Sequence, residues 1–95
     1  MLMTRDELSR EIRHISEDEA KALRVPLSPE AVDYLATPPP DFIDGATQVD
    51  VVPPILRRTI HDILHRAKMY NTGTVKEDLV KNIMTTSPRR YLWFS

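Results

Sequence analysis

Cysteine is absent from the 95 residues, so the chain forms no disulfide and offers no thiolate as a nucleophile or metal ligand. Glycine occurs only twice, at Gly45 and Gly73, which excludes a glycine-rich phosphate-binding loop. No apolar run approaches the roughly 20 residues of a membrane-spanning helix, and the start of the chain lacks the apolar segment of a signal peptide. We therefore expect a cytoplasmic protein without a transmembrane segment.

Net charge is almost absent as well, at −1, which argues against a generally cationic nucleic-acid binder. The charges are unevenly distributed along the chain. Residues 1–50 carry five basic and eleven acidic residues, a net charge of −6, whereas residues 51–95 carry eight basic and three acidic residues, a net charge of +5. The two halves could neutralise each other within one domain, bind head to tail between copies, or bind a charged partner.

Two capping boxes lie near the start of the chain. In the first, the Thr4 hydroxyl would accept a hydrogen bond from a free helical N–H while Glu7 reaches back to the cap. The helix that this box opens has three apolar residues on one face: Leu8, Ile12 and Ile15. The second box, Ser16–Glu19, predicts a new short helix that ends before Pro26.

A third helix start is followed by a proline-rich segment. Ser28 as N-cap, with proline at the first helical position, predicts a helix to about Ala36. Residues 37–54 hold five of the eight prolines, which excludes a helix interior and favours extended chain. We expect an ordered crossing in which Phe42–Ile43 and Val49–Val52 are held against the domain as short extended chain, such as a strand.

The strongest helical pattern covers residues 55–70 and follows Pro53–Pro54. Its apolar side chains form one stripe about 100° wide. The stripe consists of Leu56, Ile60, Ile63, Leu64 and Ala67. After a turn at Asn71–Gly73, a capping box at Thr74–Glu77 predicts a last helix that ends before Pro88. The apolar residues of that helix are Leu79, Val80, Ile83 and Met84.

These patterns predict an all-α fold, a small bundle of four or five short helices with a proline-rich crossing loop and an aromatic C-terminal tail. We expect a single domain over residues 1–95. Its parts are an acidic helical half (1–36), the proline-rich connection (37–54), a basic helical hairpin (55–86) and the aromatic tail (87–95).

A basic ridge is predicted on the side of the long helix that lies opposite its apolar stripe. The members of this basic ridge are Arg57, Arg58, His61, His65 and Lys68. Such a ridge can bind an acidic protein surface or phosphate groups, or can simply be hydrated. His61 and His65 have the i, i+4 spacing of a zinc site, but the neighbouring cations would repel a metal ion, so we expect no metal there.

The aromatic tail is the second candidate for partner binding, because three of the six aromatic residues lie in the last five positions. A chain end is usually polar and loosely held. We expect this one to pack on its own core, on a partner or sister subunit, or on a membrane interface. Tyr, Trp and Arg are common anchors at protein interfaces. The candidate residues in the tail are Arg89, Arg90, Tyr91, Trp93 and Phe94.

No catalytic motif stands out in the sequence, so we expect neither an enzyme nor a cofactor. The predicted function is that of a small non-catalytic accessory or regulatory protein that binds another protein, as a subunit or modulator of a larger complex. A homo-oligomer held by acidic and basic complementarity is one form such binding could take. The alternative is a nucleic-acid-associated protein that uses the basic C-terminal half, although Glu77 and Asp78 would face DNA unfavourably in a helix-turn-helix.

Overall fold

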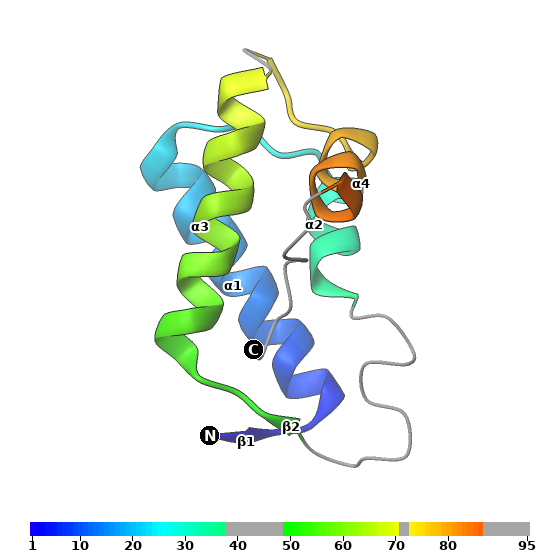
Figure 1. Cartoon of the computed structure of the whole chain (residues 1–95). Coiled ribbons are helices and arrows are strands. Elements are labelled where there is room, and N and C mark those ends of the chain that lie inside the picture. Colours follow the sequence, from blue (N-terminus) through cyan, green and yellow to red (C-terminus); the bar gives the residue numbers. More distant parts are fainter. Residues whose placement is uncertain (38–48, 71–72, 87–95) are drawn as a thin grey trace.

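The computed structural model describes residues 1–37, 49–70 and 73–86, and it confirms the all-α bundle. The helices are α1 (Arg5–Leu23), α2 (Pro29–Ala36), α3 (Pro53–Tyr70) and α4 (Glu77–Thr86), and the short strands are β1 (Leu2–Met3) and β2 (Val49–Asp50). Helix α1 packs against α2 and α3, and α4 packs against the same two helices. The four helices therefore form a closed ring of contacts, with α1 and α3 side by side (Figure 1).

Helix α1 begins as predicted, at the capping box of Thr4 and Glu7. The backbone N–H of Glu7 donates to the Thr4 hydroxyl at 3.2 Å, and the backbone N–H of Thr4 donates to the Glu7 carboxylate at 2.9 Å. The helix ends at Arg24, whose φ of 58° and ψ of 43° are left-handed. This conformation lets the N–H groups of Arg24 and Val25, just after the helix, donate to the carbonyls of Lys21 and Ala20.

The second capping box, at Ser16, is wrong, because α1 runs without interruption from Arg5 to Leu23. Ser16 is fully buried in the middle of the helix rather than at a helix start. The same helical face continues beyond it with the buried Ala20. Burial of this face favours continuation of the helix over a new start, so tertiary packing overrides the local capping signal.

Helix α2 and the strand before α3 confirm two further predictions. The Ser28 hydroxyl accepts a hydrogen bond from the backbone N–H of Ala31 at 3.1 Å, as expected of an N-cap. Of the extended segment expected at 49–52, residues 49–50 form β2, which pairs antiparallel with β1 so that Leu2 lies opposite Asp50. Val51 is fully buried, whereas Val52 is exposed. Phe42–Ile43 lies outside the described residues.

Helix α3 starts at Pro53, two residues earlier than expected, because the carbonyl of Val52 accepts the N–H groups of Ile55 and Leu56 at 3.0 Å each. Proline is suited to this first position because it has no N–H to leave unpaired. The predicted stripe is confirmed in full. All five of its members are completely buried: Leu56, Ile60, Ile63, Leu64 and Ala67.

The capping box at Thr74 is wrong, because α4 begins only at Glu77. Val75 is fully buried and forms an isolated parallel bridge with Leu27. Its N–H donates to the carbonyl of Pro26 at 2.8 Å, and its carbonyl accepts from Ser28 at 2.9 Å. Because these bonds hold Val75 in an extended conformation, α4 can begin only after it, at Glu77. Its apolar face is as predicted, with Val80 and Ile83 buried and Leu79 and Met84 partly buried.

Candidate functional site

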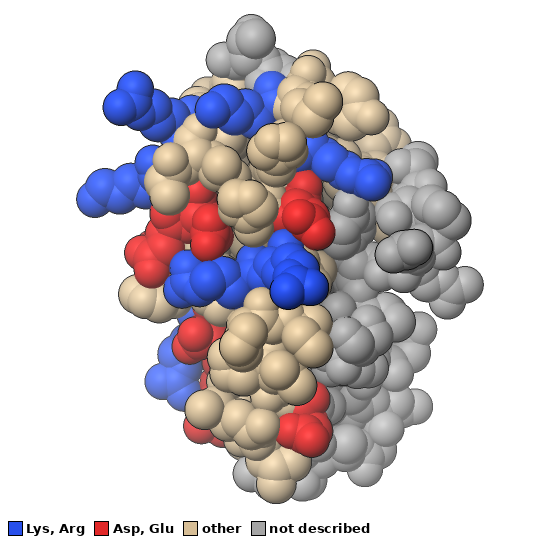
Figure 2. Space-filling model, turned by 60° about the vertical axis from the view of Figure 1, so that its left-hand side comes forward, with Lys and Arg blue, Asp and Glu red and all other residues tan. Residues whose placement is uncertain are grey.

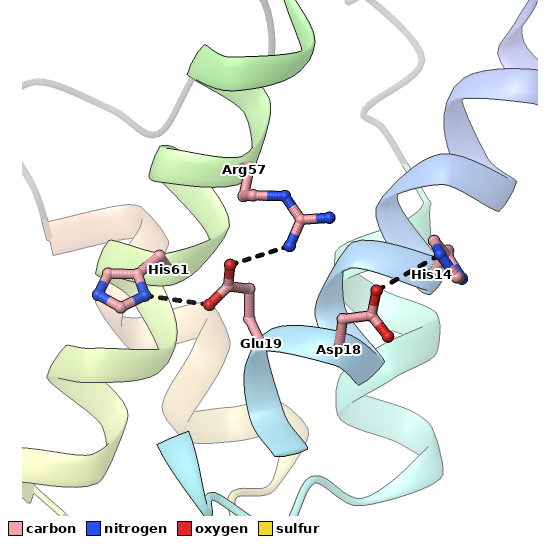
Figure 3. A network of polar contacts seen from close by, with 5 residues as sticks. All are labelled: His14, Asp18, Glu19, Arg57 and His61. Atoms are coloured by element: carbon pink, nitrogen blue, oxygen red, sulfur yellow. Dashed lines mark hydrogen bonds and ion pairs between the residues drawn. The ribbon is translucent and has the colours of Figure 1, made fainter. Parts of the chain in front are cut away.

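The predicted basic ridge separates into two groups in the structure. Arg57, His61 and Lys68 lie on the side of α3 that meets α1. The Arg57 guanidinium donates to Glu19 Oε1 at 3.1 Å, and Nδ1 of His61 lies 3.1 Å from Glu19 Oε2 (Figure 3). The Lys68 ammonium donates to the carbonyl of Leu23 at 3.0 Å. Three of the five ridge residues thus connect the basic half to the acidic half.

Glu19 is the acceptor that sequence reasoning missed. Its side chain is only 14% exposed, and each of its carboxylate oxygens contacts one side chain of α3, Oε1 the Arg57 guanidinium and Oε2 the His61 ring. Partial burial raises the pKa of Glu19, but the hydrogen bonds from His61 and Arg57 and their charges lower it by more, so that the net shift is downward. Glu19 follows Leu8, Ile12 and Ile15 at helical spacing and so lies on the apolar face of the helix. A carboxylate at such a position was the sequence signal that it would need a charged partner.

Arg58 and His65, the other two ridge residues, lie on the outward side of α3. In the part of the chain that the structure describes, neither forms an ion pair. The ring of His65 stacks on that of His61, with centroids 6.1 Å apart and planes inclined by 19°. His61 is therefore shared between the two groups: one ring nitrogen meets Glu19, and one ring face meets His65.

A longer row of exposed residues includes Arg58 and His65, which we call the outer stripe of α3. Its spacing of three or four residues places its members on one side of the helix. The members are Ile55, Arg58, Asp62, His65 and Met69. Met69 is 74% exposed, although it is a large apolar side chain. Figure 2 shows the α1–α3 side of the molecule, where basic, acidic and uncharged side chains are interspersed.

A shallow groove of about 400 Å³ lies between α1 and α2. Its apolar lining includes Ala20, Leu27 and Val32. Arg13 and Asp33 also line it and form an ion pair at 2.8 Å. The groove therefore combines an apolar surface with one ion pair and the carboxylate of Glu17, and its lining contains no hydroxyl or imidazole nucleophile.

The remaining site predictions concern the aromatic tail and metal binding. The tail residues Arg89, Arg90, Tyr91, Trp93 and Phe94 lie outside the described residues. Among residues 1–37, 49–70 and 73–86, no group of three or more His, Asp or Glu side chains is placed to hold a metal ion. None of the helices in these ranges combines the length and the apolar character that crossing a bilayer requires.

Comparison with known proteins gives no functional information beyond this geometry. No protein-family model, no curated protein and no solved structure matches the chain.

Proposed function

We propose that this chain is a small non-catalytic accessory or regulatory protein of the cytoplasm, which binds another protein as a subunit or modulator of a larger complex. The observation that carries the proposal is the outer stripe of α3. There, exposed apolar Ile55 and Met69 flank Arg58, Asp62 and His65 on one side of a helix. Protein interfaces use both apolar and charged contacts, and this side of the helix offers both.

The mixed charge of the outer stripe favours a protein over a nucleic acid as the partner. Asp62 lies between Arg58 and His65 in this row, and a carboxylate there would repel phosphate groups. Three of the five ridge residues are already engaged with α1, which leaves fewer cations for a phosphate backbone. A homo-oligomer remains one form of the proposed binding, since Arg58 of one copy could meet the acidic half of another.

Affinity purification from the native host tests this proposal with two charge-matched variants. Arg58→Glu changes the outer stripe, whereas Lys81→Glu makes the same charge change at an exposed position on α4. We expect a defined partner to co-purify with the wild type and with Lys81→Glu, and to be lost with Arg58→Glu. Deletion of Tyr91–Ser95 tests the contribution of the tail in the same assay.

Two outcomes would contradict the proposal. The first is co-purification of the same protein with Arg58→Glu in undiminished amount, since the outer stripe would then not be the binding surface. The second is retention on heparin or nonspecific DNA that disappears in moderate salt, accompanied by no protein partner. That result would favour the nucleic-acid alternative, because phosphate contacts are lost as salt rises.

A further inference from the structure

The two histidines of α3 form a pair at the edge of its contact with α1, where His61 meets Glu19 and His65 faces outward. Their rings are one helical turn apart and stack with centroids separated by 6.1 Å. His65 is exposed, and the side chain of His61 is 44% exposed. Solvent therefore reaches both rings, and His65 has room to turn toward its neighbour.

Glu19 fixes the orientation of the His61 ring and the position of its proton. A carboxylate only accepts hydrogen bonds, so the 3.1 Å contact from Nδ1 to Glu19 Oε2 requires the proton on Nδ1. In the neutral ring, Nε2 then carries a free lone pair. Figure 3 shows this second nitrogen on the side of the ring away from Glu19. A histidine held in this way by a carboxylate is typical of metal sites, where the outer partner orients the ligand.

The structure removes much of the repulsion that the sequence led us to expect for a cation at this place. The Arg57 guanidinium is paired with Glu19 Oε1 at 3.1 Å, so its charge is largely compensated. The Lys68 ammonium is directed to the carbonyl of Leu23 on the α1 side. Arg58 is the cation of the ridge that remains on the outward face without a partner in the described part of the chain.

We propose that His61 and His65 together bind a divalent transition-metal ion of the Zn²⁺ or Ni²⁺ class, with Glu19 as the positioning residue for His61. Imidazole nitrogens suit these metals. Each Zn–N bond is about 2.1 Å long, so binding would bring the two coordinating nitrogens within about 4 Å of each other. Rotation of the exposed His65 ring provides this approach.

The proposed site is open rather than structural. Two protein ligands leave the other coordination positions to water or to a donor from a partner, whereas structural zinc sites use four protein ligands. The fold accordingly does not depend on the metal, and the ion would exchange readily. This proposal concerns a ligand of the chain itself and does not require the proposed protein-binding function.

Isothermal titration calorimetry of the full chain with Zn²⁺ alone and with Ni²⁺ alone, near neutral pH, tests the site. We expect one ion per chain. His65→Ala should weaken binding at least tenfold, and it leaves the fold intact because the side chain makes only the ring contact with His61. His61→Ala should weaken binding to the same extent. Glu19→Gln should weaken it about tenfold, which is the usual effect of losing an outer partner of a ligand.

His14→Ala provides the matched control, because it removes a histidine that pairs with Asp18 on α1 at 3.4 Å and leaves His61 and His65 in place. Its metal affinity should equal that of the wild type. Thermal melts of the metal-free variants verify that each remains folded. The proposal is overturned if the wild type binds neither ion, or if His65→Ala binds as tightly as the wild type.

Discussion

Among single residues, Glu19 joins the two oppositely charged halves through contacts with two side chains. It comes from the acidic half, lies among the apolar residues of α1, and receives Arg57 and His61 from the basic half. Part of the opposite charge of the two halves is thus paired within one molecule. Only Arg58 and His65 of the predicted ridge remain on the outward side of α3, where a partner could reach them.

The charge on Glu19 should make stability depend on pH. At neutral pH we expect Glu19→Gln to lower the free energy of unfolding by about 1 kcal/mol, because its hydrogen-bond partners are half exposed. The folded pKa of Glu19 lies below its ordinary value of 4.5. The stabilising contribution is therefore complete above that value and is lost as the pH falls through the lowered folded pKa.

Urea titrations of the wild type and Glu19→Gln across this acidic range measure the effect. The two free energies of unfolding should converge as the pH falls. Glu17→Gln serves as the control, since Glu17 is exposed and forms no ion pair in the described part of the chain. A gap between wild type and Glu19→Gln that stays constant to low pH would show that the charge of Glu19 is not the cause.

Two serines of α1 should respond in opposite directions to replacement by alanine. The Ser16 hydroxyl is fully buried and has no hydrogen-bond partner among the described residues, so Ser16→Ala should stabilise the fold by about 0.5–1 kcal/mol. The Ser9 hydroxyl donates to the carbonyl of Ala36 on α2, so Ser9→Ala should destabilise it by about 1 kcal/mol. Thermal or urea unfolding measures both, and a loss of stability in Ser16→Ala would contradict this account.

At the scale of elements, the ends of the helices show where local signals suffice. Helix α1 begins at the capping box of Thr4 and α2 at the N-cap Ser28, whereas no helix begins at the similar signals at Ser16 and Thr74. A hydroxyl acts as an N-cap only where the preceding backbone is extended and the tertiary structure allows a break. Ser16 is instead packed inside a helix, and the residue after Thr74 pairs with Leu27.

The left-handed Arg24 predicts a stabilising substitution at the end of α1. It is the non-glycine residue with positive φ in the described chain, at 58°. A side chain costs about 1 kcal/mol in this conformation and glycine does not, so Arg24→Gly should raise the free energy of unfolding by up to that amount. Lys21→Gly, inside the same helix, should lower it by about 1 kcal/mol. Equal destabilisation by both in urea unfolding would contradict the role assigned to the conformation.

The apolar stripe of α3 and the burial of its five residues could be predicted from helical periodicity alone. Periodicity depends only on the positions of the apolar residues in the sequence. Periodicity places the ridge opposite the stripe, but it could not show which edge of the ridge meets α1. That depends on how two helices cross. Glu19 was overlooked for the same reason, since its partners lie about 40 residues away in the sequence.

For the whole molecule, the core is the feature that joins the two halves. Buried side chains from all four helices belong to one cluster, including Leu8 of α1, Leu35 of α2, Leu56 of α3 and Val80 of α4. Neither half has a core of its own, although they differ so strongly in charge.

Separate peptides of residues 1–50 and 51–95 should therefore each be largely unfolded, because neither can bury its apolar stripes alone. An equimolar mixture should regain helical circular dichroism and a cooperative melt. Attraction between halves of net charge −6 and +5 assists this association at low salt. A cooperative melt of either peptide on its own, unchanged by the other, would show that the halves are independent domains.

The backbone bridge between Leu27 and Val75 joins the connection between α1 and α2 to the residues just before α4. Leu27 lies between α1 and α2, and Val75 lies between α3 and α4. The hydrogen bonds of Val75 with Pro26 and Ser28 hold residues 26–28 against Val75, and these two segments cannot separate without breaking them. The bridge therefore opposes movement of the α1–α2 pair relative to the α3–α4 pair. A partner would consequently meet a preorganised surface and would lose little free energy to ordering it.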